Sequence, residues 1–124
     1  MSASGAPQIL REGNVTVVAY GPECDRITED HIPETLQTLL SAITGSNPCM
    51  LFDLSHVKFF GSSFIEVLFR VWNRIQQQPG GRFALCGLTP NCAEVIEVTN
   101  LDRLWPTFPT REAALQALQT PGAT

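Results

Sequence analysis

Cysteine and histidine are the side chains in this sequence that could bind a metal ion or pair a nucleophile with its base. His31 and His56 lie far apart in the sequence, and neither stands beside a nucleophile pattern. The cysteines show no C-x-x-C spacing and no histidine at metal-ligand distance; they are Cys24, Cys49, Cys86 and Cys92. The sequence therefore gives no positive sign of a metal site or a catalytic pair. The thiols are expected to be reduced, and those in apolar runs to be buried.

Two adjacent hydroxyls, Ser62 and Ser63, follow a turn at Gly61 and precede a stretch of helical periodicity. Serine is favoured as an N-cap residue because its side-chain oxygen accepts a hydrogen bond from a free amide of the first turn. If Ser63 is the cap, Glu66 stands where the acidic residue of a capping box would reach back. The two serines are therefore expected at the start of a helix.

Three phenylalanines, Phe59, Phe60 and Phe64, surround these serines. Adjacent strand residues point to opposite faces, so one of Phe59 and Phe60 is expected in the core. The other, together with Phe64, is either core filling or an exposed anchor for a partner. Asp53, near the end of an apolar strand, is expected to have a structural role.

Hydrophobic periodicity predicts the elements that position these residues. Apolar runs predict strands at 15–20, 49–54 and 82–88, a short strand at Ile9-Leu10, and an edge strand at 104–108 that contains Pro106. Amphipathic stripes predict helices over 28–43, from Ser62 or Ser63 to Ile75, from Pro90 to Val98, and over 110–119. This alternation predicts an α/β fold, a mostly parallel central sheet of about four to five strands flanked by about four helices. A doubly wound topology is the default expectation.

The composition fits one domain over residues 9–120, with a flexible tail expected over residues 1–8. Hydrophobic residues make up 44%, charged residues 16%, and the formal net charge is −4. Because the basic residues are scattered, a nucleic-acid partner is not expected. The chain has no signal-peptide pattern and no apolar run long enough to cross a bilayer, so a cytoplasmic location without membrane insertion is expected. No Gly-rich loop follows a strand, and no enzyme activity or cofactor is expected.

Several segments occur in the order of a known family pattern. Gly21-Pro-Glu-Cys-Asp25 is similar to a Gly-Glu-Leu-Asp segment before the first helix, and Gly61-Ser62-Ser63-Phe64 stands in the place of Asp-Ser-Ser-Gly. The apolar strand that begins Leu51-Phe-Asp-Leu leads to that motif, and similar endings are found at Leu88-Thr-Pro, at 95–104 and at 112–118. From about Val15 to Leu118, the chain therefore resembles the STAS family, typified by bacterial anti-sigma factor antagonists.

This resemblance implies a small sheet flanked by helices and a role in binding other proteins. The family's antagonists are phosphorylated on the first serine of the motif by a partner kinase that is also an anti-sigma factor. The resemblance thus makes Ser62 the phosphorylation candidate, with Ser63 as second choice. A phosphate there would face the free amides and the positive end of a helix dipole. The implied partner-binding residues are Asp25, Phe60, Gly61, Ser62, Ser63 and Phe64.

The motif also departs from the family pattern, since Gly61 replaces its Asp and Phe64 replaces its Gly. The loss of the acid removes a charge that a partner could read, and a bulky Phe64 could obstruct a kinase. Two functions therefore stay open. One is a phosphorylation-switched antagonist bound by a serine kinase or anti-sigma factor. The other is a non-switching STAS scaffold, or a small subunit of a transporter or stress-signalling complex; the oligomeric state is left open in both.

Overall fold

The computed structural model describes residues 8–12, 15–20, 26–27, 37, 49–60, 62–78 and 80–119. Of the sequence predictions, the helix over 28–43 and nearly all of the N-terminal tail lie outside these ranges. So do the residues Asp25, Gly61, Cys24 and His31.

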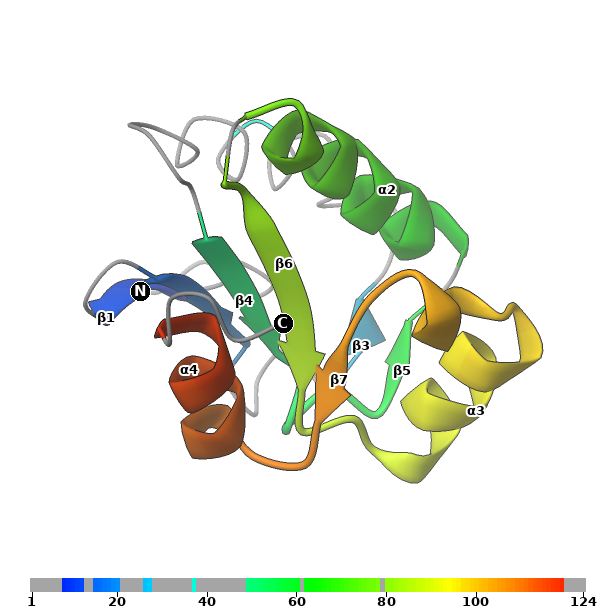
Figure 1. Cartoon of the computed structure of the whole chain (residues 1–124). Coiled ribbons are helices and arrows are strands. Elements are labelled where there is room, and N and C mark those ends of the chain that lie inside the picture. The colour runs from blue at the N-terminus through cyan, green and yellow to red at the C-terminus, as the bar shows by residue number, and fades with distance from the viewer. Residues whose placement is uncertain are drawn as a thin grey trace.

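The central sheet has five strands in the order β1-β2-β4-β6-β7 (Figure 1). Their bounds are β1 Gln8–Glu12, β2 Val15–Ala19, β4 Cys49–Asp53, β6 Arg82–Cys86 and β7 Thr107–Phe108. Strand β1 pairs antiparallel with β2, and every other pair in this sheet is parallel. The predicted mostly parallel sheet is confirmed, including the short strand before β2 and the edge strand after Pro106. The doubly wound expectation is wrong for the described strands, because their order runs in one direction without reversal.

A second, two-stranded sheet pairs β3 (Arg26–Ile27) in parallel with β5 (Phe59–Phe60). The described helices are α2 (Ser62–Gln76), α3 (Pro90–Val98) and α4 (Arg111–Gln119), with a short 3-10 helix, η3, at Leu101–Arg103. Figure 1 shows α4 on one side of the central sheet and α2 on the other.

Alternation along the strands divides the core into two parts. On β4, Met50 and Phe52 join the cluster under α2, whereas Cys49 and Leu51 join the cluster that contains residues of α4. The α2 cluster is the larger, and it holds the side chains Phe64, Leu68, Val71 and Ile75 of that helix. Since both faces of β4 are covered, all five of its residues are buried.

Helix α3 begins where the sequence predicts, with Thr89 as its N-cap and Pro90 in its first turn. The Thr89 side chain makes no cap hydrogen bond to its own helix. Its hydroxyl donates instead to the Val57 carbonyl at 2.7 Å, and the Cys92 thiol lies 3.3 Å from the same oxygen. These two contacts fix the start of α3 against the loop that leads into β5.

Candidate functional site

The structure places Phe60 and Phe64 inside the protein. Phe60 is 2% exposed and Phe64 is 0% exposed. Their ring centroids lie 5.2 Å apart, and the edge of Phe64 also meets Tyr20 at 5.8 Å. Of the two alternatives for Phe64, core filling is correct and the exposed anchor is wrong, because its ring fills the core under α2. The predicted opposition of Phe59 and Phe60 is confirmed, since Phe59 is 49% exposed.

The predicted phosphorylation candidates Ser62 and Ser63 lie in the first turn of α2, as its first two residues. Their side chains, like Gly61 and Asp25, lie outside what the structure describes. Glu66, expected to reach back in a capping box, pairs with Arg70 at 3.2 Å on the exposed face of the helix. The partner-binding role of the serines thus stays a prediction.

The small sheet brings two segments that are distant in the sequence side by side. Arg26 follows Asp25 directly and pairs with Phe59, and Ile27 pairs with Phe60. Because the strands are parallel, both chains leave the sheet at the same end. One of them then enters α2 at Ser62. The register therefore brings the segment after the first Gly-Pro turn beside the approach to α2.

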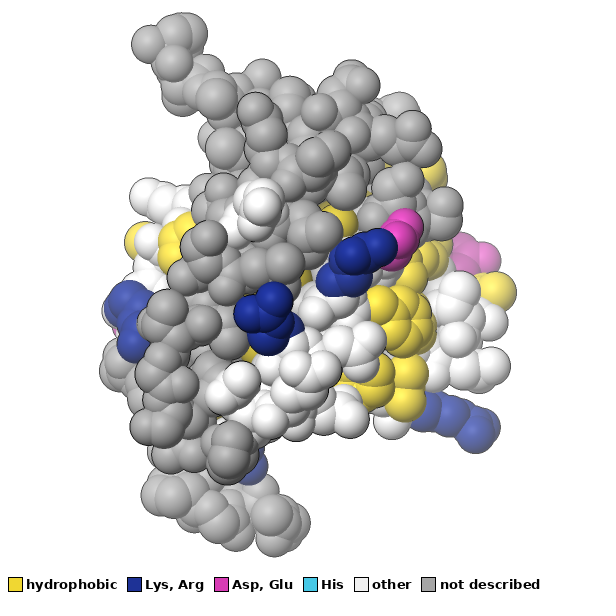
Figure 2. All heavy atoms as spheres, turned by 90° about the horizontal axis from the view of Figure 1, so that it is seen from above, with side chains coloured by type: hydrophobic (Ala, Val, Ile, Leu, Met, Phe, Trp, Pro, Cys, Tyr) yellow, Lys and Arg dark blue, Asp and Glu magenta, His cyan; other side chains and the backbone are white. Residues whose placement is uncertain are grey.

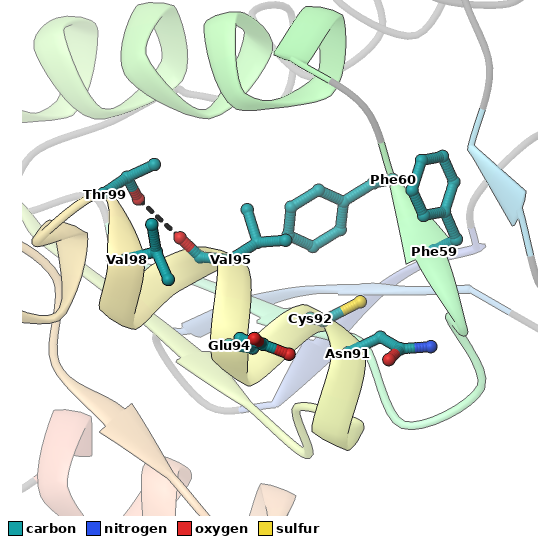
Figure 3. Close-up of a pocket in the computed structure, with 8 residues that line it drawn as sticks. All are labelled: Phe59, Phe60, Asn91, Cys92, Glu94, Val95, Val98 and Thr99. Atoms are coloured by element: carbon teal, nitrogen blue, oxygen red, sulfur yellow. Dashed lines mark hydrogen bonds between the residues drawn. The ribbon is translucent and has the colours of Figure 1, made fainter.

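An open groove lies between β5 and the exposed side of α3, with a volume of about 490 Å³. Figure 3 shows the Phe60 ring pointing toward Val95, with Glu94 and Asn91 extending from the same helix. The residues that line the groove are Phe59, Phe60, Asn91, Cys92, Glu94, Val95, Val98 and Thr99. The Thr99 hydroxyl donates to the Val95 carbonyl at 2.7 Å, so it is already used within the helix.

The groove residues of α3 were not singled out as a site from the sequence. The sequence pattern places Val98 on the buried stripe of α3, but it is 73% exposed, while the fully buried residues of the helix are Cys92 and Ile96. The sequence did indicate that α3 has an exposed apolar residue, because Val95, Ile96 and Val98 spread over more of the helix surface than one narrow stripe can bury. Only the placement of β5 beside α3 shows which of these faces a groove.

Asp53 forms a polar cluster at the carboxyl end of β4. Its Oδ1 accepts hydrogen bonds from the Ser55 amide at 3.0 Å and from the Ser55 hydroxyl, and its Oδ2 accepts from Arg111 Nε at 2.8 Å. Burial acts to raise the pKa of this carboxyl, but the Ser55 hydrogen bonds and the Arg111 charge outweigh it and hold the pKa below its ordinary value. Asp53 therefore stays ionised and ties α4 to the sheet.

The described thiols are poor nucleophiles. Burial raises the pKa of Cys49 and Cys92, and burial with the nearby Asp53 charge raises the pKa of Cys86 to about 12. Within the described ranges, no three His, Cys, Asp or Glu side chains gather closely enough to hold a metal ion. None of the helices in those ranges is long and apolar enough to cross a membrane.

The surface on the α2 side mixes side-chain types. Viewed from above, the described basic side chains lie apart from one another, and hydrophobic side chains reach the surface between them (Figure 2). The Arg70–Glu66 pair on α2 is of this mixed kind, with side chains 60% and 65% exposed. An exposed pair of this kind contributes little to stability and leaves both charges accessible to a partner.

The fold and motif position are those of a STAS domain. The model of the STAS domain family matches residues 6–114, and the chain therefore belongs to this family. No curated protein sequence matches the chain significantly.

Solved structures agree with this assignment. An anti-sigma-factor antagonist (STAS) domain protein from Planctomyces limnophilus is 39% identical, covers 93% of this chain and 99% of its own, and has a TM-score of 0.87. An anti-sigma factor antagonist from Mycobacterium paratuberculosis is 25% identical over 97% of this chain and 100% of its own, with a TM-score of 0.79. A chain of the stressosome, a signal integration and transduction hub, is 24% identical over 90% of this chain and 96% of its own. Its TM-score is 0.69, so it shares the fold.

Proposed function

We propose that this protein is a regulatory module of the anti-sigma factor antagonist type, which binds a serine kinase or anti-sigma factor through the turn at Gly61 and the first turn of α2. The observation that carries this proposal is the near full-length similarity to the antagonist-type STAS protein from Planctomyces limnophilus, at 39% identity. We further propose that Ser62 is the residue modified.

The chemistry of a helix start supports a phosphate at this position. The first amides of α2 have no acceptor inside the helix, and the dipole of this 15-residue helix is positive at its N-terminus. A phosphate on Ser62 would add about −1.5 to −2 charge next to the partner. If the partner buries this turn, the added charge must be desolvated, so phosphorylation weakens the complex.

The burial of Phe64 removes one objection to this mechanism. A bulky residue in place of the motif's glycine would obstruct a kinase only if its ring stood on the surface. The ring is 0% exposed and packs on Phe60 and Tyr20. It therefore holds the first turn of α2 on the core and does not itself obstruct a partner that binds this turn.

We propose a binding role without catalysis, in the cytoplasm where ATP-dependent kinases act. The raised pKa values of the described thiols support this, because they disfavour thiolate chemistry. In the groove, the Thr99 hydroxyl is held by a backbone carbonyl and has no base as its acceptor.

Intact-mass spectrometry tests the proposal directly. The protein is incubated with ATP and the anti-sigma-type serine kinase of its native host. Wild type should gain one phosphate, Ser62→Ala none, and the matched control Ser63→Ala should still gain one. An unmodified wild type, or a modified Ser62→Ala variant, would overturn Ser62 as the switch.

A non-switching scaffold, or a small subunit of a transporter or stress-signalling complex, is the second candidate. Gly61, which replaces the motif's acidic residue, favours it, as does the shared fold with a stressosome chain. A pull-down from the native host with wild type and Ser62→Glu separates the two functions. A scaffold retains its partner in both forms, whereas the switched antagonist loses it in Ser62→Glu.

A further inference from the structure

The groove between β5 and α3 is apolar and built on a fixed floor. Phe60 and Cys92, which form part of its lining, are 2% and 1% exposed. The hydroxyl of Thr89 and the thiol of Cys92 hold the Val57 carbonyl just before β5. Its volume of about 490 Å³ lies in the range of preformed binding sites. The groove therefore needs no rearrangement to accept a large apolar side chain.

Two large hydrophobic side chains stand at the edge of this groove. Val98 is 73% exposed and Phe59 is 49% exposed, and both line it. Hydrophobic side chains exposed around a preformed groove are typical of a surface that a partner covers.

The charged groups at the groove are acidic. Glu94 lines it, and Glu97 and Asp102 follow on the exposed side of α3 and η3. Basic residues also lie close by without lining the groove: Lys58 precedes Phe59, Arg26 pairs with Phe59 across the small sheet, and Arg103 follows Asp102 on η3. Among the described lining residues the charged one is therefore Glu94, and its carboxylate favours a cationic group on the occupant.

The connection from β5 to α2 favours a protein as the occupant. Phe59 and Phe60 form β5, and α2 begins at Ser62. A partner seated on the first turn of α2 therefore lies within a few residues of the groove. A protein chain that covers the turn can therefore continue into the groove.

We infer that the groove between β5 and α3 receives a hydrophobic side chain flanked by Lys or Arg from a protein partner, with Glu94 pairing the cation. This inference rests on the proposed function, because it makes the groove a second part of the surface that begins at the first turn of α2. The Phe60 ring with Val95 and Val98 of α3 (Figure 3) then contacts the inserted side chain, and the partner's positive charge pairs with Glu94.

The first test titrates the 15N-labelled protein with a short amphipathic helical peptide of leucine and lysine. The amide chemical shifts of the protein are measured by NMR at each peptide concentration. Shifts at Phe59, Val95 and Val98 that saturate with peptide support the inference. Val98→Asp should weaken binding by at least about tenfold. Shifts spread over the whole acidic surface, or equal binding by the same peptide with glutamate in place of lysine, would overturn it.

A matched pair of charge reversals separates local pairing from overall charge. Glu94→Lys and Glu97→Lys change the net charge equally and lie one helical turn apart on the exposed side of α3, but only Glu94 lines the groove. Glu94→Lys should weaken peptide binding about tenfold, and Glu97→Lys by about twofold or less at physiological salt. Equal effects of the two variants would contradict a pairing role for Glu94.

The second test uses the kinase or anti-sigma partner itself and distinguishes failure of the groove from failure of the proposed function. If wild type binds this partner and Glu94→Lys and Val98→Asp bind it equally well, the groove inference fails and the proposed function stands. If wild type does not bind it at all, the proposed function fails, and the inferred single partner for both surfaces fails with it.

Groove-specific shifts with phenethylammonium but not with the peptide would assign a small cationic ligand. Self-association lost in Val98→Asp would assign a second copy, and either result overturns the inference.

Discussion

Arg111 of α4 and Asp53 of β4 form an ion pair across 58 residues of chain, with Arg111 Nε 2.8 Å from Asp53 Oδ2. The Asp53 side chain is only 10% exposed, and its other oxygen is held by Ser55. One carboxylate therefore fixes three segments, namely the end of β4, the loop after it and the start of α4.

Asp53→Asn should lower the free energy of unfolding by about 1 to 3 kcal/mol, because the partly buried Arg111 loses its countercharge. Urea denaturation at neutral pH measures this loss. The control Glu66→Gln removes an exposed ion pair and should change the free energy by no more than about 0.5 kcal/mol. Equal losses in the two variants would contradict the special role of Asp53.

The stability supplied by Asp53 should depend on pH. The pKa of this carboxyl is lowered in the folded protein, so its contribution is fully present above the unfolded value of about 3.9 and is lost as the pH falls through the folded value. The difference in free energy of unfolding between wild type and Asp53→Asn should be constant from about pH 7 to about pH 5 and shrink below about pH 4. A difference that grows on acidification would have the wrong sign.

Phe64→Ala should cost far more stability than Phe59→Ala. Phe64 is fully buried between Tyr20, Phe52 and Phe60, so its truncation leaves a cavity and should cost about 3 to 5 kcal/mol. Phe59 is half-exposed, and its truncation should cost less than half as much. Thermal and urea unfolding of both variants measures the ratio, and comparable losses would show that Phe64 is not a core residue.

Gly87→Ala should destabilise the protein through two effects. Gly87 has φ +68°, a conformation that costs an L-residue about 1 to 2 kcal/mol. A Cβ there would also press on the Ser55 hydroxyl, which donates to Asp53. Repeating the substitution in a Ser55→Ala background should recover part of the loss, and identical losses in both backgrounds would show that backbone strain is its sole cause.

Cys86 should resist alkylation in the folded protein. Its thiol is buried and its pKa is raised to about 12, so almost no thiolate is present at about pH 8. Treatment with iodoacetamide and peptide mapping should show the Cys86 peptide unlabelled in buffer and labelled in urea. Rapid labelling in buffer would mean that the carboxyl end of β6 opens readily.

The order and type of the strands of the central sheet and of helices α2, α3 and α4 could be predicted from the sequence because they rest on local rules, whereas the short strands β3 and β5 and the 3-10 helix η3 were not predicted. β-Branched and aliphatic runs make β2, β4 and β6 strands, and Thr89-Pro90 opens α3. Asn100, with φ +61°, follows α3 and ends it where the sequence predicts. The STAS resemblance rested on the same ordered segments, and the family match over residues 6–114 confirms it.

The sequence by itself thus determined the central strands, the approximate bounds of helices α2 to α4 and the family, since each depends on residues close together in the chain; the cap expected at Ser62 or Ser63 was wrong, because both are the first residues of α2. Only the tertiary structure decided that Phe64 is buried while Val98 is exposed, that Arg111 meets Asp53, and that β5 and α3 enclose a groove. Periodicity marks a residue as apolar and gives its face of an element. Which face is covered depends on neighbours distant in sequence, and the packing of β5 beside α3 supplies that information.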